Sequence, residues 1–305
     1  MQAHVANAPV SYGAFELTVG LDANVPDGEK VLDEVSRAGY VGIDLGPVGY
    51  LGDGPVLANR LSERGLGLAG AYLELPFPDA ERLEEALPEL DAMLDTFDAV
   101  VGTLEAPPPR PTLADAGSKE RRARPGRAHA EPSMGYSDDE WRDFGEGLRA
   151  VVTRCRDRGY EPTFHHETGT FVEAPWEIER VLELSDIGLC LDTGHLFICG
   201  GEPVQALRDW GERINHVHLK DARRDRMRQV VEAGEATEAI WSKEVFCPLG
   251  EGDVDVDDIL IELRRLNFDG WLVVEQDTLP RTAERFLRAA EHQRANRRYL
   301  SDRGF

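Results

Sequence analysis

The chain contains 305 residues, of which 34 are lysine or arginine and 57 are aspartate or glutamate, so its formal net charge at pH 7 is -23. This negative charge excludes a nucleic-acid backbone as the main partner, because the phosphates would be repelled. The sequence has no apolar run long enough to span a membrane, and its start, MQAHVANAPVSYG, lacks a secretory pattern. Its four cysteines show no CxxC spacing, so we expect a reduced, cytoplasmic protein.

Short apolar runs alternate with longer amphipathic stretches along the whole chain. In chain order, the apolar runs predict strands at residues 4–13, 40–46, 66–75, 99–106, 161–168, 187–195, 214–221 and 271–277. The amphipathic stretches predict helices that include residues 28–39, 79–97, 139–159, 202–213, 255–267 and 281–300. This alternation predicts an α/β fold, a single (β/α)8 TIM barrel domain over residues 1–305. An open doubly wound sheet fits less well, because no GxGxxG or phosphate loop follows the first strand.

Two long segments interrupt this rhythm, and both follow predicted strands. Residues 107–136, after the fourth strand, are rich in proline, glycine and arginine, so we interpret them as a flexible insertion or lid. The arginines of this segment could also contact an acidic partner surface. Residues 222–254, after the seventh strand, end in CPLGEGDVD, which is typical of a glycine-rich turn before a helix. We therefore expect long βα loops after strands 4 and 7, on the same face of the barrel.

Ionisable residues gather at the ends of the last four predicted strands. Glu167, Asp192, His218 and Glu275 lie at the carboxyl ends of predicted strands, where TIM barrels carry their catalytic groups. The residues before Asp192 (LCL) and before Glu275 (VV) are apolar, as buried strands require. Unpaired buried carboxylates are costly unless a cation or hydrogen bonds compensate. Two glutamates, one aspartate and one imidazole suit a single divalent ion. Such a donor set favours Mn, and Mg, Co or Zn would also be accommodated.

The segment FHHETGT, residues 164–170, places two histidines beside Glu167. Side chains alternate between the two faces of a strand, so His165 and Glu167 should share one face and His166 should take the other. We expect His165 to point into the barrel mouth, where it contacts substrate or acts as an acid or base. We expect His166 to face the helices or to support a ligand.

The same set of residues suggests a reaction on a keto-sugar or keto-inositol. A divalent ion that is chelated by a ketone and a neighbouring hydroxyl stabilises an enediolate, so the adjacent C–H becomes acidic enough for a base. The base candidates are His165, His195, Glu167 and Glu275. Lys220 is a candidate acid or oxyanion partner, although a salt bridge at the barrel rim would explain it equally well. We further assign substrate binding to the following residues: Asp44, Glu74, His195 and Lys220.

Four motifs carry a resemblance to a known family. DTGH (192–195), HVHLKD (216–221), GWLVVEQD (270–277) and GYVGIDLGPVGYL (39–51) resemble the xylose-isomerase-like TIM barrel superfamily of sugar isomerases and epimerases, and most of all its inosose dehydratase-like members. The resemblance runs from NAPVSYGAFE (7–16) to the last helix.

The resemblance implies a ligand set and a reaction class. Asp192, His218 and Glu275 match three metal ligands of the superfamily, and the fourth belongs at the end of strand five. Epimerases of this group carry Glu there, whereas many dehydratase relatives read HHH or HPH. This sequence reads HHE, so Glu167 falls on the third position of that pattern. The implied activity is that of a divalent-metal-dependent lyase, with dehydratase-type elimination from a keto-inositol or keto-sugar.

Several alternatives remain open at this point. The same site could serve a sugar epimerase or isomerase, or the catalytic subunit of a complex that cleaves C-glycosides next to a 3-keto group. A homo-oligomer or a small partner subunit is compatible with the sequence. A metal-free sugar-binding barrel is the non-enzyme alternative. A DNA-repair endonuclease of the same superfamily is disfavoured, because the ends of strands two to four offer Asp44, Glu74 and Glu105 but no histidine.

Overall fold

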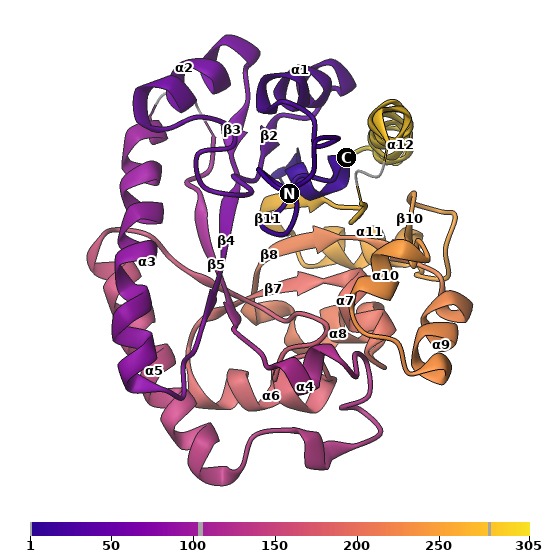
Figure 1. Cartoon of the computed structure of the whole chain (residues 1–305). Helices are drawn as coiled ribbons and strands as arrows, with labels where there is room; N and C mark the ends of the chain where they lie inside the picture. The colour runs from indigo at the N-terminus through magenta and orange to yellow at the C-terminus, as the bar shows by residue number, and fades with distance from the viewer. Residues whose placement is uncertain (1, 103–105, 280–281) are drawn as a thin grey trace.

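The computed structural model describes residues 2–102, 106–279 and 282–305 (Figure 1). The strands are β1 (Gln2–Asn7), β2 (Gly42–Ile43), β3 (Gly67–Leu68), β4 (Gly70–Leu75), β5 (Arg110–Asp115), β6 (Thr163–His165), β7 (Gly188–Asp192), β8 (Ile214–Leu219), β9 (Asp221–Ala222), β10 (Phe246–Cys247) and β11 (Asp269–Val274). The α-helices are α1 (Gly28–Ala38), α2 (Gly54–Arg64), α3 (Ala80–Val100), α4 (Lys119–Arg122), α5 (Asp138–Asp157), α6 (Pro175–Leu184), α7 (Thr193–Ile198), α8 (Pro203–Trp210), α9 (Arg224–Ala233), α10 (Glu238–Ser242), α11 (Val256–Arg265) and α12 (Ala283–Ser301). Three short 3-10 helices are η1 (Pro9–Tyr12), η2 (Pro132–Met134) and η3 (Gly211–Arg213). No helix in the described ranges is long and apolar enough to cross a membrane.

The strands form a nearly closed parallel barrel. Nine of them pair in the order β3-β2-β1-β11-β8-β7-β6-β5-β4. β3 and β4 are separated only by Ala69, and they pair with different neighbours, β3 with β2 and β4 with β5. Ala69 continues both pairings, because its N–H donates to Ile43 O (2.9 Å) and its carbonyl accepts from Arg110 N (3.1 Å). β3 and β4 therefore serve as one barrel strand, and the predicted TIM-barrel class is confirmed.

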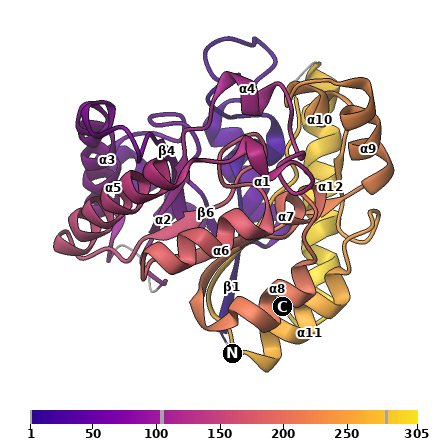
Figure 2. The same ribbon diagram turned by 90° about the horizontal axis from the view of Figure 1, so that it is seen from below.

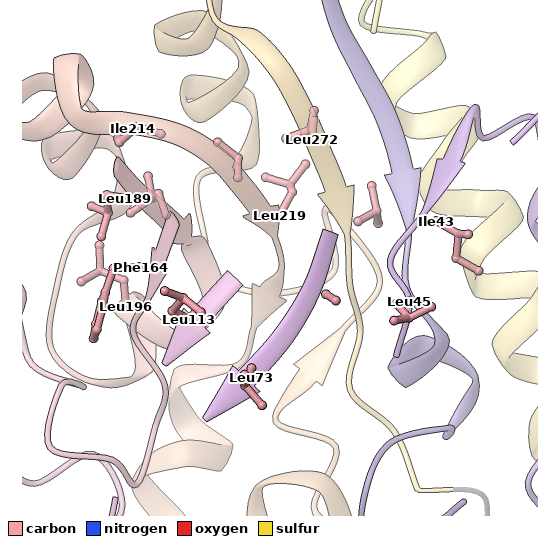
Figure 3. Close-up of a cluster of buried hydrophobic side chains, with 14 of the residues drawn as sticks. Ile43, Leu45, Leu73, Leu113, Phe164, Leu189, Leu196, Ile214, Leu219 and Leu272 are labelled. Atoms are coloured by element: carbon pink, nitrogen blue, oxygen red, sulfur yellow. The ribbon is translucent and has the colours of Figure 1, made fainter. Parts of the chain in front are cut away.

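Apolar side chains hold the helices against the outside of the barrel. Figure 1 shows α3 and α5 on one side of the strands and α9, α10 and α12 on the other. Leu113, Phe164 and Leu189 come from three neighbouring strands and are completely buried (Figure 3). The Phe164 ring lies 6.0 Å from the ring of Phe144 on α5, so Phe164 faces the helices. Its neighbour His165 consequently faces the barrel interior.

The fourth strand lies elsewhere than the sequence predicted. Residues 99–106 do not form it, because α3 continues to Val100, and Phe97 and Val100 are both buried on this helix. Residues 103–105 lie outside the described part of the chain. The strand is β5, within the segment that we interpreted as an insertion, and it pairs with β4 over its whole length. The sequence did not predict β5 because it contains Pro111 and follows further prolines, and proline is unusual in a buried strand.

A buried ion-pair network anchors the segment after β5. The Arg121 guanidinium donates to both carboxylate oxygens of Glu177, at 2.8 and 3.1 Å. Glu173 accepts hydrogen bonds from the backbone N–H groups of Gly126 (3.1 Å) and Gly169 (2.7 Å). These hydrogen bonds and ion pairs hold residues 116–136 against the turn that follows β6.

A single carboxylate organises the segment after β8. Asp221 accepts four backbone hydrogen bonds, from the N–H groups of Ala222, Gly250, Gly252 and Val254, at 2.8 to 3.1 Å. Asp221 itself is fully buried. The glycine-rich turn is therefore drawn against the end of β8, where β9 and β10 form a short antiparallel pair.

Candidate metal centre and active site

Three side chains from adjacent strands meet at the mouth of the barrel. Asp192 ends β7, His218 is the penultimate residue of β8's HVHL run, and Glu275 directly follows β11. They offer ligand atoms that all lie within 4.8 Å of one another. His218 Nδ1 lies 3.1 Å from Glu275 Oε2 and 3.7 Å from Asp192 Oδ2. The structure therefore brings together three of the four residues to which the sequence assigned metal binding.

Asp192 is held so that one oxygen is directed into this group. Its Oδ1 caps α7 by accepting a hydrogen bond from the backbone N–H of His195 at 2.9 Å. Its Oδ2 is buried and makes no hydrogen bond. Burial alone would raise the pKa of Asp192, but the nearby Lys220 ammonium and the histidines outweigh burial and hold this pKa well below its usual range. Asp192 is therefore an ionised carboxylate whose Oδ2 faces the Lys220 ammonium at 3.1 Å and His165 Nε2 at 3.4 Å.

The two ionisable residues of FHHETGT that share a face have different neighbours. His165 Nε2 lies 3.4 Å from Asp192 Oδ2, and the His165 ring centroid lies 5.0 Å from that of His218. Glu167 instead places Oε1 3.2 Å from His195 Nε2, and its Oε2 lies 3.6 Å from His165 Nδ1. His165 is thus beside the Asp192–His218–Glu275 group, while Glu167 lies one side chain further out.

His166 supports the end of the neighbouring strand. Its Nε2 accepts a hydrogen bond from the backbone N–H of Asp192 at 3.2 Å. The ring is completely buried and lies parallel to the His165 ring, with centroids 5.8 Å apart. His166 therefore contacts the backbone of a candidate ligand, whereas His165 contacts its side chain.

Lys220 lies among three carboxylates. Its Nζ is 3.1 Å from Asp192 Oδ2, 2.9 Å from Glu275 Oε2 and 3.0 Å from Asp277 Oδ1. Burial would lower the pKa of Lys220, but these carboxylates outweigh burial and raise it well above its usual value. The surroundings of Asp192 and Glu275 therefore already stabilise a buried positive charge.

His195 connects the turn after β6 to the end of β11. Its Nδ1 lies 2.8 Å from Thr168 Oγ1, and its Nε2 faces Glu167 and, at 3.6 Å, Asp277 Oδ2. Burial would lower the pKa of His195, but the Glu167 carboxylate outweighs burial and raises it. Burial also raises the pKa of Glu167, to about 7. The pKa values of Glu167 and His195 are therefore both raised, which is common among residues of functional sites.

The two residues proposed from strands two and three lie at different distances from this centre. Asp44 Oδ2 lies 3.4 Å from His218 Nε2, on the side of the imidazole opposite to Glu275. Glu74 lies further out, where Oε2 accepts a hydrogen bond from Arg122 at 2.8 Å and Oε1 accepts one from Tyr72 at 3.1 Å. Asp44 thus contacts a candidate ligand, and Glu74 contacts the loop after β5.

Sequence reasoning did not assign a role to Thr168 or Asp277, although both contact His195. For Asp277 a signal was available, because a residue two positions after Glu275 is directed to the same side of an extended chain. For Thr168 no signal was available, since its contact with His195 is set by the turn that follows β6.

The side chains present fit one divalent ion. His218 Nδ1 and Asp192 Oδ2 are buried and have no hydrogen-bond partner among the described residues. Imidazole nitrogens and carboxylate oxygens together suit Mn, Zn or Co. His165, Asp192, His218 and Glu275 would supply the two nitrogens and the carboxylates of such a centre.

The fold and this cluster define a TIM-barrel protein with a candidate metal centre at the carboxyl ends of its strands. The sequence profile of the xylose isomerase-like TIM barrel family matches residues 32–296, and the chain belongs to this family. The resemblance noted in the motifs is therefore confirmed.

Curated relatives align with most of the chain. It is 29% identical over 265 residues to an inosose dehydratase of Geobacillus kaustophilus, covering 86% of this chain and 83% of that protein. It is 31% identical over 271 residues to the rhizopine catabolism protein MocC of Rhizobium meliloti, covering 84% and 76%. These relationships identify the chain as an enzyme.

Solved structures share the fold at lower sequence identity. The IolI protein with a bound zinc atom superposes with a TM-score of 0.68 at 15% identity, covering 98% of this chain and 97% of that one. An L-ribulose 3-epimerase superposes with a TM-score of 0.67 at 15% identity, covering 98% and 94%. At these identities the likeness supports the barrel fold alone.

Proposed function

We propose that this chain is a divalent-metal-dependent lyase that eliminates water from a keto-inositol or keto-sugar. The observation that carries the proposal is the meeting of Asp192, His218 and Glu275 at the barrel mouth, beside the Glu167–His195 pair. Relatives named as inosose dehydratases, which align with most of the chain, support elimination and a keto-inositol as the substrate.

Within this proposal, the fourth metal ligand is His165. The sequence favoured Glu167 for this role, but His165 Nε2 lies 3.4 Å from Asp192 Oδ2, and Glu167 lies against His195 instead. We expect Mn, Co or Zn to bind better than Mg, because two of the four donors are imidazole nitrogens and Mg prefers oxygen ligands.

The bound ion would act as a Lewis acid that polarises the substrate ketone and stabilises negative charge on its oxygen. The protein groups would move the protons. Glu167, with its pKa near neutrality, would accept the proton from the carbon next to the ketone. His195, with a raised pKa, would donate a proton to the hydroxyl that leaves from the following carbon as water. The products are an unsaturated ketone and one water molecule.

Lys220 would orient the substrate oxygens. Its ammonium lies within ion-pair distance of Asp192, Glu275 and Asp277 and donates a hydrogen bond to Asp277 Oδ2 at 3.2 Å. If the ammonium moved towards Asp277, Asp192 Oδ2 and Glu275 Oε2 would become available to a metal ion. The ammonium would then place a positive charge beside the substrate oxygen on which negative charge develops.

An NMR experiment in heavy water tests the proposal. The metal-loaded protein is incubated with 2-keto-inositol, and exchange at the carbon next to the ketone is followed together with loss of the hydroxyl. We expect exchange and elimination in the presence of Mn2+ and neither reaction after chelation. Exchange with inversion but without elimination would assign the chain to the epimerases, and reaction of the metal-free protein would refute metal dependence.

A further inference from the structure

The strand β1 carries none of the residues assigned to the candidate metal centre, yet its last residue lies between two of them. β1 pairs with β2 on one side and with β11 on the other. Asp44 directly follows β2, and Glu275 directly follows β11. Asn7, which ends β1, is therefore the neighbour of both.

The side chain of Asn7 is completely buried and donates two hydrogen bonds. Its Nδ2 donates to the carbonyl oxygen of Val274 at 2.8 Å and to Gln293 Oε1 on α12 at 3.0 Å, which uses both N–H groups of the amide. Its Oδ1 has no hydrogen-bond partner among the described residues, so the two donated bonds set the orientation of the amide. The backbone carbonyl of Asn7 also accepts a hydrogen bond from the N–H of Asp44 at 2.9 Å. One residue thus holds the peptide group before Glu275 and the backbone of Asp44.

Ser11, on η1, holds the peptide group on the other side of Glu275. Its buried Oγ accepts a hydrogen bond from the backbone N–H of Gln276 at 2.9 Å. The N–H of Glu275 itself donates to the carbonyl oxygen of Leu219 at 3.1 Å. Peptide groups are planar, so fixing the two planes that flank a residue sets its φ and ψ and the direction of its side chain. These bonds thereby direct the Glu275 carboxylate towards His218, whose Nδ1 lies 3.1 Å from Oε2.

The helix α12 supports this arrangement from outside the barrel. It packs beside α1 and η1, as Figures 1 and 2 show. Gln293 accepts the hydrogen bond from Asn7 on its Oε1, and its Nε2 donates to Gln276 Oε1 at 3.4 Å. Because Gln293 offers an acceptor to one side chain and a donor to the other, α12 holds both amides in a single orientation.

We propose that Asn7 and Ser11 are positioning residues of the metal centre and that they act through Glu275. A ligand whose direction is set before the ion arrives loses less conformational freedom on binding, so the ion binds more tightly. Loss of either hydrogen bond would free one of the peptide groups that flank Glu275, and its carboxylate would no longer be held beside Asp192 and His218. This inference rests on the proposed function of the centre, and it adds two residues that orient a ligand from behind the strand ends.

The affinity for Mn2+, measured by competition with a chelator, tests the inference. Asn7→Ala and Ser11→Ala should each weaken Mn2+ binding by roughly 10–100-fold, the usual effect of losing a residue that orients a metal ligand. Circular dichroism and urea denaturation verify that each variant is folded at the temperature of the titration. Ser11→Ala removes a single hydroxyl group, and it decides the question if Asn7→Ala does not fold.

Two variants of the same chemistry serve as matched controls. Asn296→Ala deletes a buried amide on α12 that donates to Gln293 Oε1 at 3.2 Å and accepts from the N–H of Leu249 at 2.9 Å. Ser185→Ala removes a buried hydroxyl that accepts a hydrogen bond from the N–H of Ile187 at 3.2 Å, just before β7. Both controls should lower the free energy of unfolding, as the first pair does, but leave the affinity for Mn2+ unchanged.

Unchanged affinity for Mn2+ in the folded Asn7 and Ser11 variants would overturn the inference and leave the proposed function intact, because the native protein would still bind the ion. An equal loss of affinity in the two control variants would also overturn it, since the effect would then come from a general loosening of the barrel. A native protein that binds no Mn2+ would instead refute the proposed metal centre, and the inference with it.

Discussion

His218 lies between two carboxylates, with Nδ1 3.1 Å from Glu275 Oε2 and Nε2 3.4 Å from Asp44 Oδ2. An imidazole that binds a metal through one nitrogen commonly donates the other N–H to a carboxylate, which fixes its orientation and its tautomer. Asp44 is therefore placed to orient His218, and its assignment to substrate binding stays a prediction.

This relationship predicts that Asp44→Asn weakens metal binding. The amide is neutral and accepts a hydrogen bond less strongly, so we expect a loss of roughly 10–100-fold in affinity for Mn2+. Competition with a chelator measures it directly. Asp186→Asn, which alters an exposed ion pair with Arg156, is the control. Unchanged affinity in Asp44→Asn would show that Asp44 does not act through His218.

A second prediction separates the roles of His165 and Glu167. If His165 is the fourth ligand and Glu167 the base, His165→Ala should lose bound metal, while Glu167→Gln should keep it. Glu167→Gln should reduce turnover by about 10²–10⁴-fold, the usual effect of removing a general base.

Elemental analysis of the purified variants, together with exchange rates, gives both readouts. Asp192→Ala is the reference for complete metal loss. Metal retained in His165→Ala and lost in Glu167→Gln would reverse the two assignments and restore the ligand set that the sequence first suggested.

The third prediction concerns pH. Burial raises the pKa of Glu167 to about 7, and only the ionised carboxylate can accept the substrate proton. The value of kcat/KM should therefore be constant above this pKa and fall tenfold per pH unit below it. The limb should disappear in Glu167→Gln, whose residual rate lacks this group. An acid limb near pH 4.5 would show that burial does not raise the pKa of Glu167, and a limb that persists in Glu167→Gln would show that Glu167 is not the base.

The fourth prediction concerns stability. Asp221→Asn should lower the free energy of unfolding by about 2–4 kcal/mol, because the amide NH2 cannot accept the backbone hydrogen bonds that the carboxylate oxygens accept. Thermal or urea denaturation measures the change. Asp225→Asn, on the nearby α9, is the control, because it removes the same negative charge but leaves the four hydrogen bonds to Asp221 intact. Equal stability of the two variants would refute the role of Asp221.

The sequence predicted the fold class and most of the centre because both depend on local patterns. Buried strands that end in ionisable residues placed Asp192, His218 and Glu275 correctly at the barrel mouth. The alternation rule put His165 and Glu167 on one face, but their distances to Asp192 depend on the turn after β6. That turn is shaped by Glu173 and its bond to Gly169, which periodicity does not encode.

Other features depended on contacts between distant segments. β5 was missed because its prolines resemble those of a loop, and it is identified as a strand only by its pairing with β4. Glu244 and Arg288 form an ion pair although they are 44 positions apart in the sequence, and nothing in either segment alone indicates this contact. The ion pair between Arg122 and Glu74 likewise unites two segments that the sequence treats separately.

The junction at Ala69 has a consequence for the opening motions of the barrel. β2 and β3 pair over only two residues each, whereas β1 pairs with β11, and β4 with β5, over six. Local opening requires the least free energy where the fewest backbone hydrogen bonds and contacts must be broken. Amide protons of Ile43 and Ala69 should thus exchange with solvent deuterium sooner than those of Val5 or Leu73. The barrel would then open first between β2 and β3, while β7, β8 and β11, which carry the candidate metal ligands, stay paired.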